Sequence, residues 1–549
     1  MKNKKQILAM ACALIALGNF AACGGGNTSD LESIDTTKSQ LRIGNFDGGV
    51  GTQWLNEAID RFEELYKDKS FEDGKKGVQI LVDRHKGVDV NQFANQDIDI
   101  YFLENANYYD AISTGNLLEI TDMVTEKMTE FGEDESVEDK LYDNYKAYFK
   151  TPAGKYYGIP HYKGIYAINY DRGLWDEKRL FIGADGEVNQ KSTSKTLSNG
   201  PDGKPGTYDD GLPATYDEFY KVCDVMKNNA GVDPLVWSGQ YQWYASGYLA
   251  ALKADFEGAQ ADVSYSYNGE TYDKLVKEIK ADGTVVYDEP MAITEENGYE
   301  MFRSAGNYYP VKFMEGIVEN NYYADMSFGA GNSHTATQGS FLLSKYAART
   351  GQATRIGMLI EGCWWANEAA TYVQTMESQY GESFNDRNFA IMPYPKATQA
   401  EVGKPQTVLD TARSLSCINA HIDPKNIELA KTFLQFLQTD DELVNFLKCT
   451  SMTRNFKYEV PSDVYAGLST YAKSVADVLV NCEHVLPASS SELYYKHASN
   501  FDVFGWFKLG GLEPTKLLEA GEQHKSALQI FETVKSKFNQ SSWQQLLQN

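Results

Sequence analysis

The chain has 549 residues, of which 42% are hydrophobic and 23% charged, so it can bury two moderate cores and we expect at least two lobes. Its formal charge of −25 excludes nucleic acid and anionic lipid surfaces as expected partners, because phosphate binding relies on clustered Lys and Arg. Beyond the N-terminus, the sequence contains no apolar run of the about 20 residues that a membrane-spanning helix needs.

The first 22 residues have the pattern of an export signal. Three lysines stand within the first five residues, and the apolar run that follows, residues 7–17, is too short to cross a bilayer. Residues 20–23 read Phe-Ala-Ala-Cys and resemble a bacterial lipobox, in which the cysteine receives a diacylglycerol and becomes the mature N-terminus. The resemblance implies lipid attachment at Cys23. An ordinary signal peptide cleaved near Ala22 is the alternative.

The composition after Cys23 fits such an anchor. Three glycines are followed by Asn, Thr and Ser, which make a flexible polar tether, and we place this tether at residues 23–39. We therefore expect the lipid to be the only membrane attachment of a protein on the extracytoplasmic face of the cell membrane.

The cysteines of the mature body do not form a recognisable framework. Five remain after the signal and the lipobox, an odd number at wide spacing and without any C-x-x-C pair, which fits neither a set of disulfides nor a zinc site. We expect free, buried thiols at Cys223, Cys363, Cys417, Cys449 and Cys482.

After the tether, strands and helices alternate. Residues 40–46 predict a short strand, and apolar positions between residues 54 and 65 recur at helical spacing. Residues 78–82 and 98–103 predict buried strands, and a helical stretch leads from the second of these to Leu117. The glycine turn before the first helix lacks the pattern of a nucleotide-binding loop, so it is a plain tight turn. The order indicates an α/β lobe with a sheet rich in parallel strands.

The middle of the chain contains a crossover and two extra segments. Two short extended runs around Pro160 suit a passage between lobes. Residues 179–213 are rich in Gly, Asp, Asn and Ser and predict an insertion loop, whereas residues 263–290 contain Asn-Gly and Asp-Gly turns that favour at least one hairpin. Helices are predicted over 216–226 and 248–253.

The last third continues the same pattern. Residues 356–360 and 389–392 predict apolar strands. Asp423 followed by Pro424 then opens a helix, with an aspartate at the N-cap and a proline at the first helical position.

Several sequence landmarks, in this order, resemble the family 1 extracellular solute-binding proteins, the sugar-binding subunits of ABC importers. The similarity covers most of the mature chain. After the lipobox and the strand, turn and helix at 41–65, it runs through residues 99–103 (Asp-Ile-Tyr-Phe-Leu), 115–118 (Gly-Asn-Leu-Leu), 157–162 (Tyr-Gly-Ile-Pro-His-Tyr), 357–365 (Gly-Met-Leu-Ile-Glu-Gly-Cys-Trp-Trp), 388–395 (Asn-Phe-Ala-Ile-Met-Pro-Tyr-Pro) and 416–445.

The resemblance implies a two-lobed type II periplasmic-binding-protein fold, of the α/β class, with an interlobe cleft. The chain would cross between lobes near residues 153, 408 and 450, which gives a first lobe of 40–152 plus 408–450 and a second lobe of 153–407 plus 451–549. A carbohydrate, in the first instance an oligosaccharide, would bind in the cleft, and lobe closure would present the protein to a membrane permease. We expect a monomer without catalytic activity and without a required cofactor. This sequence is longer than the simplest members of the family, and the extra length lies mainly in the insertions at 179–213 and 263–290.

Trp364 is the strongest candidate for a sugar contact. It follows a strand and a glycine, where similar sugar binders offer an indole to a pyranose face, and such stacking pairs the apolar face of the sugar with the negative face of the ring. Trp365 is a second candidate. Adjacent residues of an extended chain point in opposite directions, so a place in the core is easier to reconcile with one of the two tryptophans than with both. Glu361 could accept hydrogen bonds from hydroxyl groups, and a solvated surface carboxylate is the alternative.

Further candidates come from other segments. Tyr241 and Trp243 lie in an aromatic cluster that opens a helix of the second lobe, where packing aromatics are the alternative. His161 and Tyr162 stand at the interlobe crossing, although a lone histidine is more often a core residue. The remaining candidates for polar or stacking contacts are Trp54, Asn105, Tyr109, Arg413 and Arg454.

Carboxylates cluster among glycines in the first insertion. Asp202, Asp209 and Asp210 suit a hard, oxygen-ligated cation such as calcium, but their spacing is not that of an EF-hand. A solvent-exposed turn is the alternative to a calcium loop.

Other classes of function stay open at this point. A surface-anchored glycan hydrolase would also need aromatic residues and paired carboxylates, although no G-x-S-x-G nucleophile motif occurs. A binding protein for a peptide or polyamine would suit the acidic body. An adhesin would require β repeats, which the alternating α/β pattern does not show.

Overall fold

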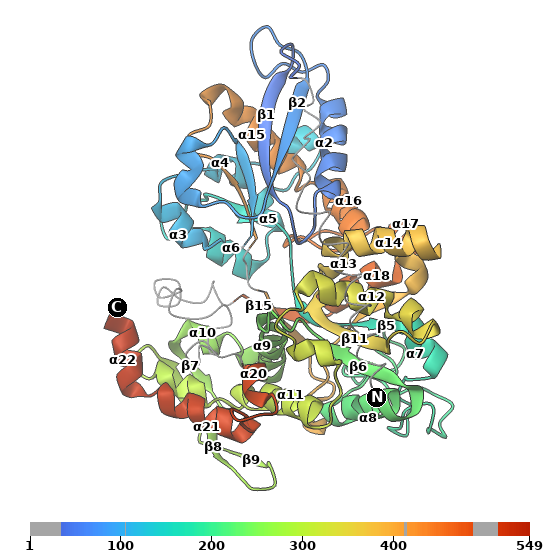
Figure 1. Ribbon diagram of the computed structural model, residues 1–549. Helices are drawn as coiled ribbons and strands as arrows, with labels where there is room; N and C mark the ends of the chain where they lie inside the picture. Colours follow the sequence, from blue (N-terminus) through green and yellow to red (C-terminus); the bar gives the residue numbers. More distant parts are fainter. Residues whose placement is uncertain (1–33, 105, 411–413, 487–513, 549) are drawn as a thin grey trace.

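The computed structural model describes residues 34–104, 106–410, 414–486 and 514–548, which form two α/β lobes (Figure 1). The signal peptide, Cys23 and residues 23–33 of the tether lie outside the described residues, as do Asn105 and Arg413. In the described part of the chain, no helix combines the length and the apolar composition that crossing a membrane requires.

The first lobe is built on a five-stranded sheet with the order β2-β1-β3-β14-β4. β1 runs parallel to β2 and β3, and β14 runs antiparallel to β3 and β4. The predicted strands of this region are present, as β1 (Ser39–Phe46), β2 (Val78–His85) and β3 (Ile100–Leu103), joined by β4 (Ile159–Pro160) and β14 (Leu415–Ile418). The sheet therefore takes one strand from a part of the chain more than 300 residues away.

The helix α2 (Gln53–Leu65) shows why distant segments share this lobe. Its predicted apolar face is buried, and Phe62 packs edge to face against Phe433, with 5.0 Å between ring centroids, and at a tilt against Phe436, with 5.2 Å. Both partners belong to α15 (Ile427–Phe436), which follows a short 3₁₀ turn capped by the side chain of Asp423. The other helices of the lobe are α3 (Tyr108–Ser113), α4 (Thr121–Thr125), α5 (Val137–Lys140), α6 (Asp143–Phe149) and α16 (Asp440–Thr450).

The second lobe is built on a four-stranded sheet with the order β12-β5-β11-β6. β11 is parallel to β6 and antiparallel to β5. All residues of the two strands β5 and β12 are buried, because helices cover the sheet on both faces (Figure 1). The strands are β5 (Tyr166–Asp171), β6 (Val232–Val236), β11 (Arg355–Gly362) and β12 (Phe389–Met392).

The helices of the second lobe include the two predicted from sequence. α8 (Tyr216–Asp224) agrees closely with the prediction, whereas α9 (Trp243–Glu257) begins five residues earlier than predicted and is buried along nearly its whole length. α9 contacts the sheet directly, as do α12 (His334–Arg349) and α18 (Thr470–Val480). The remaining helices are α7 (Arg172–Lys178), α11 (Tyr309–Glu319), α13 (Trp365–Glu368), α14 (Ala370–Tyr380) and α17 (Ser462–Gly467).

The lobes are joined where the chain passes from β4 to β5. Because β4 pairs with β14 of the first sheet, this crossing follows Pro160 and not residue 153. Lys163 forms a bridge with Thr453, so the third crossing runs beside the first. Next to them β13 (Gln406–Leu409) pairs in parallel with β15 (Cys482–Val485).

The two extra segments differ in structure. Residues 179–213 form a loop held by isolated bridges, for example between Ile182 and Val188. The second segment contains the predicted hairpin, formed by β8 (Val276–Ile279) and β9 (Val285–Tyr287) around Asp282-Gly283. The Asn268-Gly269 pair is not a hairpin turn, because it begins β7 (Asn268–Tyr272), which pairs with β10 (Met291–Thr294).

The C-terminal helices pack on this second segment, at the lower left of Figure 1. Trp543 is 2% exposed and packs against Tyr267 and Phe302. This part of the lobe consists of α10 (Val263–Ser266), α20 (Pro514–Leu518), α21 (Ala527–Lys537) and α22 (Gln540–Gln548). The five cysteines of the described body are free, three of them buried and two half-buried.

Truncating Phe62 tests the packing that joins the two halves of the first lobe. The substitution Phe62→Ala should lower the free energy of unfolding by about 3–5 kcal/mol, because it leaves a cavity between α2 and α15. Chemical denaturation measures this change. Leu65→Ala on the same helix is the control, since Leu65 is 57% exposed and should change stability little. Equal effects of the two substitutions would contradict the assigned packing.

Candidate functional site

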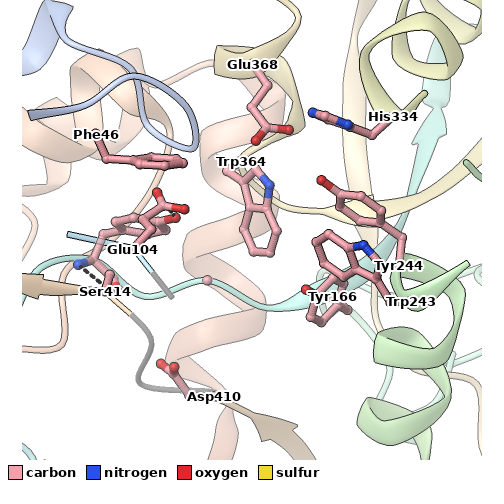
Figure 2. A pocket seen from close by; sticks show the side chains of 12 residues that line it. Phe46, Glu104, Tyr166, Trp243, Tyr244, His334, Trp364, Glu368, Asp410 and Ser414 are labelled. Atoms are coloured by element: carbon pink, nitrogen blue, oxygen red, sulfur yellow. Dashed lines mark hydrogen bonds between the residues drawn. The ribbon is translucent and has the colours of Figure 1, made fainter. Parts of the chain in front are cut away.

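A pocket of about 210 Å³ lies between the lobes (Figure 2). Six of its lining side chains are aromatic: Phe46, Tyr162, Tyr166, Trp243, Tyr244 and Trp364. The other lining side chains carry polar groups and are Glu104, His334, Glu368, Asp410 and Ser414. The pocket thus combines flat apolar faces with a small number of polar atoms, which is typical of a small-molecule site.

The fold places these side chains at strand ends and helix starts. Phe46 ends β1 and Glu104 directly follows β3, so both stand at the carboxyl edge of the first sheet. Trp364 follows β11 of the second sheet, and His334 and Trp243 are the first residues of α12 and α9. Ligands of open α/β sheets bind outside the carboxyl ends of the strands, and this pocket has that position in both lobes.

The indole of Trp364 lies directly against backbone. A Cβ added to Gly362 would stand 2.3 Å from its ring, and one added to Gly164 would stand 2.7 Å from it. Only glycine therefore permits this position of the ring. Tyr166 meets the indole edge to face, with centroids 5.4 Å apart. The ring is thus held in one orientation, and Figure 2 shows it in the middle of the pocket.

A second group of rings forms the wall on the α9 side. Trp243 and Tyr244 are stacked at 3.9 Å, and Tyr244 in turn stacks on His334 at 5.6 Å. Trp243 is 39% exposed, so its ring stands at the edge of the pocket. Burial lowers the pKa of His334, and its Nδ1 has no hydrogen-bond partner among the described residues. His334 is consequently neutral at pH 7, and its side chain lines the pocket.

Glu104 is the polar group on the first-lobe side. Its carboxylate accepts a hydrogen bond of 2.6 Å from the hydroxyl of Tyr162. Burial raises the pKa of Glu104 to about 7, because the charged form loses hydration, and the bond from Tyr162 offsets only part of this effect. The group is therefore poised between its neutral and charged forms near neutral pH.

Two further carboxyl groups share one amide on the second-lobe side. The Nε2 atom of Gln338 lies 2.9 Å from a carboxyl oxygen of Glu368 and 3.4 Å from one of Glu361. Burial raises the pKa of both groups, and the nearby charge of Glu368 raises that of Glu361 further. Because each carboxylate charge disfavours the other, ionisation of one of these two buried acids makes ionisation of the second harder.

Glu368 also connects the two lobes. The backbone N–H of Gly49, in the turn after β1, donates a hydrogen bond of 3.3 Å to its carboxylate. A Cβ at Gly49, whose φ is 52°, would stand 2.1 Å from a carboxyl oxygen of Glu104, so the two glutamates approach this turn from opposite lobes. The pocket is therefore bridged by a direct contact between the lobes.

Solved structures share this architecture. A chitin oligosaccharide binding protein matches with a TM-score of 0.52 at 15% identity, over 93% of this chain and 100% of that one. The binding protein RafE in complex with raffinose matches with a TM-score of 0.51 at 13% identity, over 91% and 99%. The GacH receptor of Streptomyces glaucescens matches with a TM-score of 0.51 at 12% identity, over 93% and 99%. The chain has the solute-binding-protein fold. No family model and no curated protein sequence matches it.

Three of the residues expected from sequence line the pocket of this solute-binding fold: Tyr162, Trp243 and Trp364. Trp364 and Trp365 do point to different surroundings. Trp365 lies in the core with 0% exposure, against Phe341 and Phe389, and this corrects its expected role as a ligand contact. α13 begins at this residue, so the extended-chain argument does not hold there.

The expected contacts of Glu361 and three further residues are also corrected by their burial. Glu361 is 1% exposed, does not line the pocket, and accepts a hydrogen bond of 3.4 Å from Gln338. Trp54, His161 and Arg454 form a buried cluster in which the guanidinium of Arg454 lies 4.8 Å from the Trp54 ring. Burial lowers the pKa of Arg454 to about 9. These side chains pack in the core next to the interlobe crossing.

Tyr109 and Tyr241 are not among the lining residues either. Tyr109 donates a hydrogen bond of 2.8 Å to the carbonyl of Tyr148, and Tyr241 packs on His334 at 5.5 Å between ring centroids. Both rings are thus used in packing next to the site.

Several lining residues were missed by the sequence analysis. Glu104 and Tyr244 each adjoin a residue that was selected, so a wider window around the strand end and the helix start could have found them. Phe46 similarly ends a predicted strand. His334 and Glu368 carry no local signal, because only the packing of α12 against α13 brings them to the pocket.

The aspartates of the first insertion serve the loop itself. Asp209 accepts hydrogen bonds from the N–H of Asp202 and the hydroxyl of Thr207, and Asp210 accepts one from the N–H of Gly206. Among the residues that the structure describes, no group of three or more His, Cys, Asp or Glu side chains is arranged to hold a metal ion. The structure therefore shows these carboxylates bonded within the loop, and calcium binding there stays a prediction.

The raised pKa of Glu104 predicts a pH dependence of stability. Its folded pKa of about 7 exceeds the ordinary value of 4.5, so the folded state binds the proton more tightly and this group's contribution to stability falls as pH rises through 7. Between pH 5 and pH 8 the loss should be about 2–3 kcal/mol. Chemical denaturation of the wild type and of Glu104→Gln, which carries no such proton, measures it. Parallel pH profiles of the two proteins would contradict the assignment.

Proposed function

We propose that the protein is a lipid-anchored, extracytoplasmic solute receptor that captures an oligosaccharide between its lobes and delivers it to the permease of an ABC importer. The observation that carries this proposal is the fixed indole of Trp364 in an interlobe pocket with five other aromatic side chains. A pyranose ring offers an apolar C–H face that stacks on such a ring, whereas its hydroxyl groups need polar partners at the edge.

The polar groups of the pocket supply those partners. The carboxyl groups of Glu104 and Glu368 and the ring nitrogen of His334 can exchange hydrogen bonds with hydroxyl groups without binding a fixed charge. Three proteins of the same fold support the choice of ligand: a chitin oligosaccharide binding protein, RafE in complex with raffinose, and the GacH receptor in complex with acarbose.

Capture between the lobes fits the contact of Gly49 with Glu368. A ligand that touches both lobes stabilises the closed arrangement by its differential affinity for that state. Closure would then be the signal that the permease reads, and the monomer is sufficient for it. The proposed role is that of a receptor without catalysis.

One observation favours a second candidate function, a glycan hydrolase. Of the three carboxyl groups that line the pocket, Glu104 and Glu368 could act as a pair, and a pKa of about 7 would suit Glu104 as a general acid. Both groups accept hydrogen bonds from protein donors, and this suits fixed hydrogen-bond acceptors better than it suits a catalytic acid and base. Incubation with the oligosaccharide that binds most tightly decides between the two, because the hydrolase would release reducing ends and the receptor would not.

Calorimetric titration of residues 24–549 with chito-oligosaccharides, raffinose and malto-oligosaccharides tests the receptor proposal. We expect tight binding of at least one class, at micromolar concentration or below, without turnover. Absence of binding across carbohydrates, with binding of a peptide or polyamine instead, would overturn the choice of ligand and leave the fold unchanged.

The substitution Trp364→Ala should weaken binding of that oligosaccharide by about tenfold or more, because it removes the stacking surface. Tyr287→Ala is a matched control, since Tyr287 is an aromatic residue that is 41% exposed on β9 and does not line the pocket. Titration calorimetry of both variants makes the comparison. Unchanged affinity in Trp364→Ala would remove this residue from the site.

The lipid anchor rests on the lipobox resemblance and is tested in cells. Cys23→Ala removes the thiol that would be acylated, so the protein should move from the membrane fraction to the soluble fraction. Immunoblotting of the two fractions measures this change. Retention of the variant in the membrane fraction would contradict attachment at Cys23.

A further inference from the structure

A second, larger cavity of about 620 Å³ opens on the second lobe. One wall is the first insertion, with Leu197, Tyr208 and Asp210, and the opposite wall is formed by α17 and α18, with Tyr465 and Lys473. Residues of β5, α7 and β12 complete its lining. The insertion that sequence analysis left without a role therefore builds one side of a cavity.

This cavity is separate from the interlobe pocket. Tyr166, at the start of β5, lines the interlobe pocket, whereas Tyr170, four residues along the same strand, lines the second cavity. That spacing corresponds to about 13 Å along the strand. The lining residues of the second cavity all belong to elements of the second lobe, so its shape does not depend on lobe closure.

Three tyrosines give the cavity aromatic surface and hydroxyl groups. Tyr170 is buried, whereas Tyr208 and Tyr465 are partly exposed, and the hydroxyl of Tyr465 donates a hydrogen bond of 2.5 Å to Asp477. Tyrosine combines a flat apolar body with a polar tip, which suits the surface of a sugar ring.

Asp210 supplies an acceptor that the protein leaves unused. One carboxyl oxygen accepts the N–H of Gly206 at 2.8 Å, but Oδ1 is buried and has no hydrogen-bond partner among the described residues. A buried carboxylate oxygen needs a donor. Because Asp210 lines the cavity, a turn of its side chain would bring Oδ1 to a ligand hydroxyl group there.

The charges of the lining residues oppose a strongly charged ligand. Arg172 and Lys473 contribute positive charge, and Asp176, Asp210 and Asp477 contribute negative charge. A phosphate would meet the aspartates, and a polyamine would meet the cations. A neutral ligand with many hydroxyl groups can use donors and acceptors of both kinds and can stack on the tyrosines.

We propose that this cavity is a second carbohydrate-binding site, built by the 179–213 insertion and independent of lobe closure. It would hold a sugar unit on the outside of the second lobe. A sugar bound there would be captured by the protein but would not be delivered to the permease from this site. The site goes beyond the proposed receptor function, because a ligand bound there would contact only the second lobe and would not favour lobe closure.

Saturation-transfer NMR with chitotriose, raffinose and maltotriose at millimolar concentration tests the proposal on residues 24–549. The background is Trp364→Ala, which weakens the interlobe site and leaves the second cavity intact. We expect saturation transfer from this variant to at least one sugar, partly through the weakened interlobe site, and a measurable loss of that signal when Tyr208→Ala is added. Tyr208→Phe should retain the signal, because it keeps the ring. Asp210→Asn, which disturbs the fold less than Tyr208→Ala does, should also weaken the saturation-transfer signal.

Loss of the signal in Tyr208→Ala with an unchanged melting temperature would support the second site. Absence of transfer in the Trp364→Ala background, or a signal that neither Tyr208→Ala nor Asp210→Asn reduces, would overturn it. The two proposals fail separately: tight binding that Trp364→Ala leaves unchanged counts against the interlobe site alone, and Tyr208→Ala in the wild-type background should leave tight binding intact.

Discussion

The contact of the Trp364 indole with two glycine backbones is the constraint on which the site depends. Gly362 ends β11 and Gly164 lies in the crossing between the lobes, so the ring is fixed at the point where the second sheet meets the first lobe. Any side chain at either glycine would displace it. The stacking surface is therefore positioned by rigid backbone, which lowers the entropic cost of binding a sugar ring.

The buried carboxyl groups of the same site lower the stability of the protein. Glu104, Glu361 and Glu368 are all held where burial raises their pKa, although a core of apolar residues would be more stable. Their partners, Tyr162, Gln338 and the N–H of Gly49, fix the directions in which their oxygens point. The arrangement sacrifices stability for oriented hydrogen-bonding groups, as functional sites commonly do.

Sequence predicted most of the fold and part of the site, for identifiable physical reasons. Periodicity located β1, α2, β11 and β12, because each has one continuous buried face or is wholly buried. Trp364 and Trp243 were found because strand ends and helix starts are visible locally. Trp365 and Arg454 were misplaced because burial depends on tertiary neighbours, and His334 and Glu368 were missed because only helix packing brings them to the pocket.

The central claim is that a carbohydrate stacks on Trp364 between the lobes. The most direct measurement is a crystal structure of residues 24–549 with the oligosaccharide that binds most tightly. Our account predicts a sugar ring parallel to the indole of Trp364, with hydroxyl groups within hydrogen-bond distance of Glu104 or Glu368. A sugar bound only outside the interlobe pocket, or within it but without contact to Trp364, would contradict the account.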